Sequence, residues 1–291
     1  TPYTSSAASD VYKRQLRYVS SARQKRLNAI SWLGEKINPS PFTSTLPFSA
    51  PGGTQNGGPS SSPETHFEPA NRSGVAGSQG TGSLGLPPSG GEVAITAGSR
   101  GIDNIVAVTR AAGDWLRKNG AVPFLAPCMG SHNGATAEGQ LAMVRSLGLT
   151  EEATGMEIRS SMEVVQIGEV ETGKVWMDRH CFEASGVLVL NRIKLHTCFS
   201  GPVQSGLTKM MVVGMGKIQS AETFHSAPTP KMKDMLLEMG ECVINSGKIY
   251  GGLALLEDGF DRTAEVHAMR PEEILDREPV PYTHLTLPTR S

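Results

Sequence analysis

The chain has 291 residues, a formal net charge of −1 and 38% hydrophobic residues. This length allows one large domain or two small ones, and the near-neutral charge argues against a general nucleic-acid binder. No apolar run approaches the roughly 20 residues that span a membrane, and no segment has the pattern of a signal peptide. Four cysteines without a C-x-x-C pair favour a reducing, cytoplasmic location over a disulfide framework or a Cys-rich zinc site.

The two ends of the chain look foreign to the rest. The segments SDVYKRQ at residues 9–15 and YTHL at residues 282–285 can both be encoded by one sequencing-adapter DNA, read on opposite strands. We therefore interpret residues 1–15 and 280–291 as non-native tails and exclude them from the fold. The alternative is an ordinary disordered tail at each end.

Residues 16–90 have a low-complexity composition. A basic helical pattern over residues 16–36 gives way, from about residue 38, to Ser, Pro, Gly and Thr with few apolar side chains. Such a segment cannot bury enough apolar surface to offset its conformational entropy. We expect it to be disordered or translated out of frame, so that the folded domain covers residues 91–279.

Within residues 91–279, expected strands and helices alternate along the chain. Short apolar runs predict strands at 92–97, 121–127, 162–168, 174–178, 186–193 and 251–258. Helical spacing predicts helices over 103–120, with Asp103 as N-cap and Gly120 at C′, over 136–147, and over 231–247, ending at Gly247. This order is typical of a layered α/β domain with a mainly parallel sheet and helices on both faces.

Three polar residues stand just beyond the ends of expected strands. Arg100 follows the first strand, His132 follows the second, and His196 follows the run at 186–193. Ligands of open α/β sheets bind in the crevice at the carboxyl ends of the strands. We therefore expect these three side chains to converge on one cleft, provided that their strands are neighbours in the sheet.

Familiar nucleotide and metal motifs fail in this sequence. VVGMGKIQS has Gln219 where a dinucleotide loop needs glycine, which disfavours an NAD-dependent dehydrogenase. GPVQSGLTK has Leu207 where a phosphate loop needs Lys before its Ser or Thr, and no H-E-x-x-H is present. His180 and Cys181 are adjacent, and neighbouring side chains of a strand point in opposite directions, so a metal site there is disfavoured.

Four motifs, read in order, resemble the N-terminal domain of the nickel-dependent lactate racemase family. They are AITAGSRGI, GSHNGATAEGQ, NRIKLHT and SGLTKMMVVGMGKIQSAETFH, and the resemblance covers about residues 90 to 279. It implies a Rossmann-like domain, an isomerase that racemises or epimerises a small 2-hydroxy acid, and a C-terminal domain that lies beyond this chain. It also implies proteins for cofactor synthesis and insertion as partners, and neither nucleic acid nor membrane.

The same resemblance implies a cofactor and the residues that serve it. The family carries a nickel pincer nucleotide, of the nickel-pyridinium-3,5-bisthiocarboxylic acid mononucleotide type, joined to a lysine through a thioamide. By position in the motifs, the implied residues are Lys209 as the tether (with Lys217 as a less favoured substitute), His225 as the nickel ligand, His132 and His196 as catalytic bases, and Arg100 as the substrate-orienting residue.

These residue types suit the implied reaction. Loss of the Cα hydrogen as a hydride leaves a flat keto acid, and no side chain accepts a hydride, so a cofactor must. Two histidines can take and return the hydroxyl proton of the two enantiomers, and an arginine can hold the carboxylate in a bidentate manner. Two other functions stay open: a non-catalytic α/β domain that binds a nucleotide or metabolite, and an inactive fragment.

Each of these residues also has an ordinary structural alternative. His132 could be a turn residue, and His196 could be a buried histidine with its hydrogen bonds satisfied. Lys209 could be a solvated lysine at the start of a helix, and His225 could cap a helix. Arg100 could pair with the C-terminus of a helix.

Overall fold

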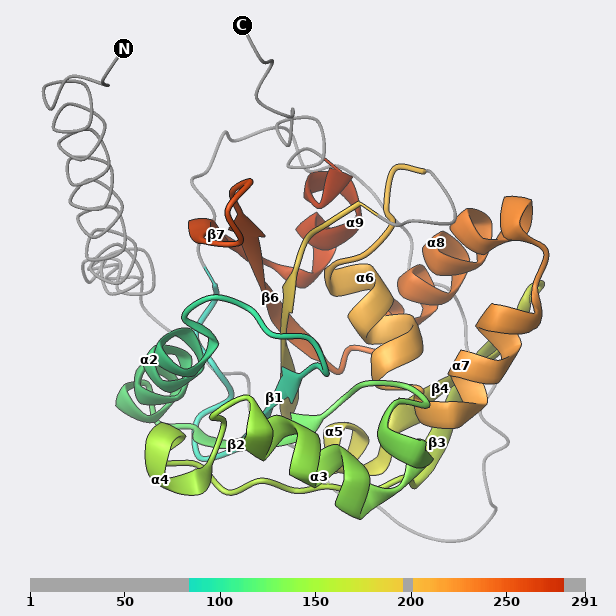
Figure 1. Cartoon of the computed structure of the whole chain (residues 1–291). Coiled ribbons are helices and arrows are strands. Elements are labelled where there is room, and N and C mark those ends of the chain that lie inside the picture. The colour runs from blue at the N-terminus through green and yellow to red at the C-terminus, as the bar shows by residue number, and fades with distance from the viewer. Residues whose placement is uncertain (1–83, 196–200, 280–291) are drawn as a thin grey trace, which may run out of the picture. The chain divides into compact units, whose positions relative to one another are not determined.

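The computed structural model describes residues 84–195 and 201–279, which belong to one contact unit built around a five-stranded sheet (Figure 1). The strand order is β2-β1-β5-β6-β7, in which the first four strands are parallel and β7 is antiparallel to β6. A separate antiparallel pair joins β3 and β4. The strands are β1 (Glu92–Ala97), β2 (Val122–Pro127), β3 (Val164–Val170), β4 (Gly173–Asp178), β5 (Gly186–Arg192), β6 (Ile249–Glu257) and β7 (Thr263–Met269). The expected α/β fold with a mainly parallel sheet is confirmed.

The strands of the sheet are apolar because both of its faces are covered. Along β1, Val93 and Ile95 belong to one core cluster, whereas Ala94 belongs to a second cluster together with Phe124 of β2. Successive side chains of a strand point to opposite faces. A strand that is buried on both sides therefore reads as a continuous apolar run, which made these strands visible in the sequence.

Helices lie on both sides of the sheet, as Figure 1 shows. One core cluster takes its helical residues from α2 and α3, and the other takes them from α5, α6, η2, α7, α8 and α9. The bounds are α2 (Ile105–Lys118), η1 (Asn133–Ala135), α3 (Ala137–Ser146), α4 (Glu151–Thr154), α5 (Arg179–Glu183), α6 (Leu207–Lys209), η2 (Met210–Gly214), α7 (Lys217–Ser226), α8 (Thr229–Asn245), η3 (Pro271–Glu273) and α9 (Ile274–Arg277).

The start of α2 differs from the prediction. Its N-cap is Asn104, with φ 61° and no side-chain capping bond, and not Asp103. The Asp103 carboxylate instead accepts a hydrogen bond from the Thr263 backbone nitrogen at 3.0 Å, at the start of β7. Asp103 therefore bonds to a residue distant in the sequence and does not cap the helix. The C-terminal signal is confirmed, since Gly120 follows the cap residue with φ +86°.

The strand β7 and the helix α7 were not predicted from the sequence. The helix α7 buries Lys217 and Ser220, and hydrophobic periodicity cannot find a helix whose buried side chains are partly polar. The strand β7 buries Val266, Ala268 and Met269, but buried and exposed residues do not alternate regularly along it.

Several predictions fall partly or wholly outside the described residues. The tails at 1–15 and 280–291, the low-complexity segment up to residue 83, and His196 are among them, and they stay predictions. In the described ranges, Cys128, Cys181 and Cys242 are free cysteines. No helix in these ranges has the length and apolar character needed to cross a membrane.

Candidate functional site

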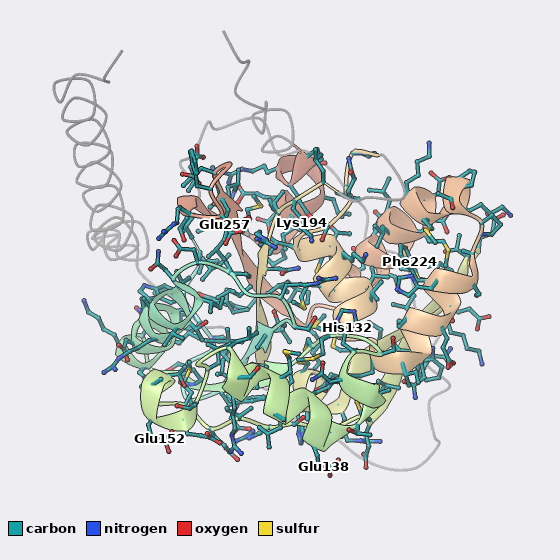
Figure 2. All side chains as sticks on the ribbon, in the orientation of Figure 1. His132, Glu138, Glu152, Lys194, Phe224 and Glu257 are labelled. Carbon is teal, nitrogen blue, oxygen red and sulfur yellow. The ribbon has the colours of Figure 1, made fainter. Side chains whose placement is uncertain are left out.

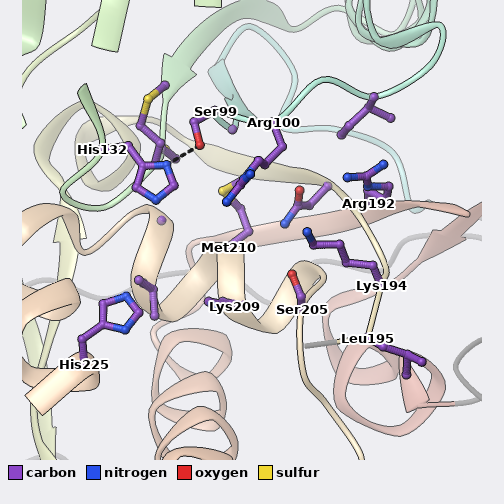
Figure 3. A pocket seen from close by; sticks show the side chains of 17 residues that line it. Ser99, Arg100, His132, Arg192, Lys194, Leu195, Ser205, Lys209, Met210 and His225 are labelled. Carbon is purple, nitrogen blue, oxygen red and sulfur yellow. Dashed lines mark hydrogen bonds between the residues drawn. The ribbon is translucent and has the colours of Figure 1, made fainter. Parts of the chain in front are cut away.

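A cavity of about 460 Å³ lies at the carboxyl edge of the sheet, where the loops that leave β1, β2 and β5 meet (Figure 3). These three strands are neighbours, so their exit loops share this edge. The run from α6 through η2 to α7 closes the other side. Among the described residues that line the cavity there is no aspartate or glutamate, and its cationic and imidazole side chains are Arg100, His132, Arg192, Lys194, Lys209 and His225.

The loop that carries His132 is held in place at its start by two backbone hydrogen bonds. At its start, the Cys128 nitrogen donates to the Ala97 carbonyl at 2.7 Å, and the Gly130 nitrogen donates to the Gly214 carbonyl at 3.2 Å. Gly130 has φ +63°, a conformation that glycine adopts without strain. The loop therefore packs directly against the η2 turn, on the opposite wall of the cavity.

The imidazole of His132 has a defined partner and a lowered pKa. Its Nδ1 lies 2.5 Å from the Ser99 hydroxyl oxygen, which fixes the ring at the exit of β1 (Figure 3). Burial lowers the pKa of His132, and the positive charges of Arg100 and Lys209 lower it further. The neutral imidazole, which can accept a proton, is thus favoured at neutral pH.

Lys209 ends α6 and precedes a π-helical turn. In η2 the Met215 nitrogen donates to the Met210 carbonyl, five residues back, at 2.9 Å. π-helical turns are rare and are frequent at functional sites. A Cβ atom on Gly214 would lie 2.6 Å from the Met210 sulfur and 2.8 Å from the Cys128 carbonyl oxygen, so glycine is required for this close approach.

His225 lies on α7, across the cavity from the exit loops. Its ring meets the ring of Phe224 edge to face, with centroids 5.4 Å apart, and the Lys209 ammonium lies 5.6 Å from the centroid of Phe224. Burial lowers the pKa of His225, as do the charges of Lys209 and, to a smaller extent, His132. The neutral ring that results can donate a nitrogen lone pair to a metal ion.

The remaining cations come from the exit loops of β1 and β5. Arg100 is exposed at the mouth of the cavity and has no hydrogen-bond or ion-pair partner among the described residues. Arg192 pairs with Glu257, whose other carboxylate oxygen accepts a hydrogen bond from the Asp103 nitrogen at 2.7 Å. Figure 2 shows Lys194 near Glu257, whereas Glu138 and Glu152 point outward from α3 and α4.

The sequence analysis did not single out Arg192 or Lys194. Both stand in NRIKLHT, at the exit of the most strand-like run, so the rule that selected Arg100 and His132 could have found them.

Lys217 does not face the cavity, so it cannot serve as the substitute tether considered above. Its side chain is fully buried, and its ammonium lies 3.1 Å from Asp178 and 3.1 Å from the Gln140 carbonyl oxygen. It also donates to the Pro127 carbonyl. Because the Gln140 amide donates to the Gly130 carbonyl at 2.8 Å, this buried group supports the His132 loop from behind.

The structure brings together Arg100, His132, Lys209 and His225, whereas His196 lies outside the described residues. His180 and Cys181 lie in α5 and not in a strand. Within residues 84–195 and 201–279, no group of three or more His, Cys, Asp or Glu side chains is arranged to hold a metal ion.

Among solved structures, the chain is similar to the lactate racemase apoprotein from Thermoanaerobacterium thermosaccharolyticum, with a TM-score of 0.49 and 16% sequence identity. The match covers 66% of this chain and 49% of that protein, so the chain spans about half the length of that racemase. No protein-family model and no curated protein matches the sequence. A likeness of this extent assigns no role to any residue.

Proposed function

We propose that this chain is the cofactor-carrying part of an isomerase that racemises or epimerises a small 2-hydroxy acid. The observation that carries the proposal is that His132, Lys209 and His225 line one cavity with Arg100. The positive charge of Lys209 lowers the pKa values of both histidines, as expected for side chains that share one cavity. These are the residues that the motif resemblance to the nickel-dependent lactate racemase family pairs with base, tether, nickel ligand and substrate contact.

The residues around the cavity fit a nickel pincer nucleotide. The cavity volume of about 460 Å³ lies within the range of sites that bind small molecules. A Cβ atom on Gly98, in the lining, would come within 3.2 Å of the Met210 methyl group, so the bare backbone keeps this wall open. Lys209 supplies an amine for a covalent tether, and His225 supplies a neutral nitrogen for nickel. When bound, the group would supply the hydride acceptor that side chains lack.

The side chains of this protein would do the rest. Arg100 would bind the substrate carboxylate through a bidentate pair of hydrogen bonds. His132 would take the hydroxyl proton and return it, with Ser99 orienting its Nδ1 so that the other ring nitrogen faces the substrate. We assign the second base, for the opposite enantiomer, to His196. The apolar part of the lining, formed by Ile102, Met129, Met210 and Val213, would limit the contact of water with the keto acid.

The experiment is production of the chain together with the cofactor-synthesis and insertion proteins, followed by metal analysis and chiral chromatography of a panel of 2-hydroxy acids. We expect nickel at close to one per chain, and loss of nickel in His225→Ala. His132→Gln should keep nickel and lose interconversion of the enantiomers by about 100-fold or more.

The matched control is His267→Gln, since His267 lies on β7 and its imidazole contacts Glu265, away from the cavity lining. This variant should keep both nickel and activity. Metabolite binding without nickel would instead favour a non-catalytic binding domain.

A further inference from the structure

The cavity has two chemically different ends. Figure 3 shows His132 and His225 on one side, with Arg192 and Lys194 on the other and Arg100 between them. Lys209 lines the same cavity, so four of its lining side chains are arginine or lysine. One arginine is enough to hold one substrate carboxylate. The end formed by Arg192 and Lys194 is therefore in excess of what a simple 2-hydroxy acid needs.

Lys194 and Arg100 both lack a hydrogen-bond or ion-pair partner among the described residues, but Arg100 is exposed whereas Lys194 is partly buried. Its backbone is fixed, because the Lys194 nitrogen donates to the Ser205 carbonyl at 2.9 Å. Arg192 differs, since the buried carboxylate of Glu257 neutralises it. The ammonium of Lys194 thus remains for a ligand.

The surroundings of Lys194 disfavour its charged form when no anion is bound. Burial lowers the pKa of Lys194, and the like charges of Arg192 and Arg100 lower it further, with Glu257 opposing them. A bound anion would relieve the repulsion among the three cations. Like charges gathered in a concave site are a common feature of sites that bind multiply charged anions.

We propose that Lys194, backed by Arg192 and lined by Ser205, forms a subsite for a second anionic group, so that the cavity takes a small dianion. This inference deepens the proposed function and rests on it only for the identity of the ligand. The second anionic group would be the second carboxylate of a 2-hydroxy diacid.

The test is calorimetric binding to the chain purified without the cofactor proteins, at low salt, with lactate, malate and inorganic phosphate as probes. We expect malate to bind about tenfold or more tighter than lactate. Lys194→Met should reduce the affinity for malate to that for lactate, while the affinity for lactate stays within about twofold. Lys194→Arg, which keeps the charge, should retain most of the preference.

The control is Lys118→Met, which removes an exposed lysine near the end of α2, away from the cavity. It should change none of these affinities. A preference for malate that depends on Lys194 supports the subsite, whereas binding of phosphate without a preference for malate over lactate contradicts it. Equal binding of all three probes, or equal effects of Lys194→Met and Lys118→Met, would overturn the proposal. Neither result depends on nickel, so the proposed function stands or fails separately.

Discussion

Two lysines, Lys209 and Lys217, stand eight positions apart in one glycine-rich stretch and have opposite surroundings. Lys209 lines the cavity beside Phe224 and His225, and its charge lowers the pKa of both cavity histidines. Lys217 is fully buried against Asp178 and lines no part of the cavity. Lys209 therefore contributes its charge to the cavity, whereas Lys217 stabilises the core through a buried ion pair.

The difference follows from the turn between them. The π-helical turn η2 and the left-handed backbone of Lys217, with φ 54°, change the direction of the chain between the two side chains. A bulky residue with positive φ is strained. The contacts of the buried ammonium with Asp178, Gln140 and the Pro127 carbonyl hold it there. Asp178 also accepts a hydrogen bond from the Cys181 nitrogen at 3.0 Å, so the pair is built into the core.

The largest effect should come from Lys217→Met. It leaves the carboxylate of Asp178 buried without its countercharge, which costs about 3–5 kcal/mol. Urea unfolding followed by circular dichroism would measure the loss. Lys209→Met, which removes a cation–π contact with Phe224, should cost about 1 kcal/mol or less. Equal losses for the two variants would contradict the distinction between the lysines.

A smaller loss is expected from Gly214→Ala, which tests the contact between the η2 turn and the His132 loop. The new Cβ would lie 2.8 Å from the Cys128 carbonyl oxygen, so backbone must move. Overpacking of this kind costs about 1–3 kcal/mol, measurable as a shift of the urea midpoint. Gly259→Ala is the matched control, because nothing lies within 4 Å of its Cβ position. A Gly214→Ala protein as stable as this control would show that the two segments do not touch.

The smallest effect is electrostatic and concerns His132. Its imidazole should titrate below the ordinary histidine pKa in an NMR pH series, and Arg100→Gln should raise that pKa by removing a nearby positive charge. Arg145→Gln, an arginine paired with Glu151 on the surface, should leave it unchanged. The protonated form is disfavoured in the folded state. As the pH falls through about 6.5, the unfolded chain therefore takes up the proton first and stability decreases. A pKa for His132 above its ordinary value would refute this picture.

Much of the fold was predictable from local pattern. The strands at 92–97 and 186–192 are buried on both faces and read directly as apolar runs. The end of α2 at Gly120 was signalled by a residue that adopts positive φ readily. The N-cap was mispredicted because Asp103 bonds to Thr263, which lies 160 residues later along the chain. Pairing at that separation leaves no local trace.

The site was predictable in part. The strand-exit rule selected Arg100 and His132, and it held because β2, β1 and β5 are neighbours, which no single sequence reveals. The environments of Lys209 and Lys217 were not predictable, because both stand in one stretch of glycines and apolar residues. Only the positive φ of Lys217 and the buried Asp178 separate them.

The most direct measurement locates the cofactor on the chain. After production with the cofactor-synthesis and insertion proteins, the protein would be cut with a protease that does not cleave at lysine, and each peptide would be weighed. The account predicts added mass on Lys209, at the cavity wall, with Lys217 unmodified. Added mass on Lys217, or nickel bound with every lysine unmodified, would contradict it.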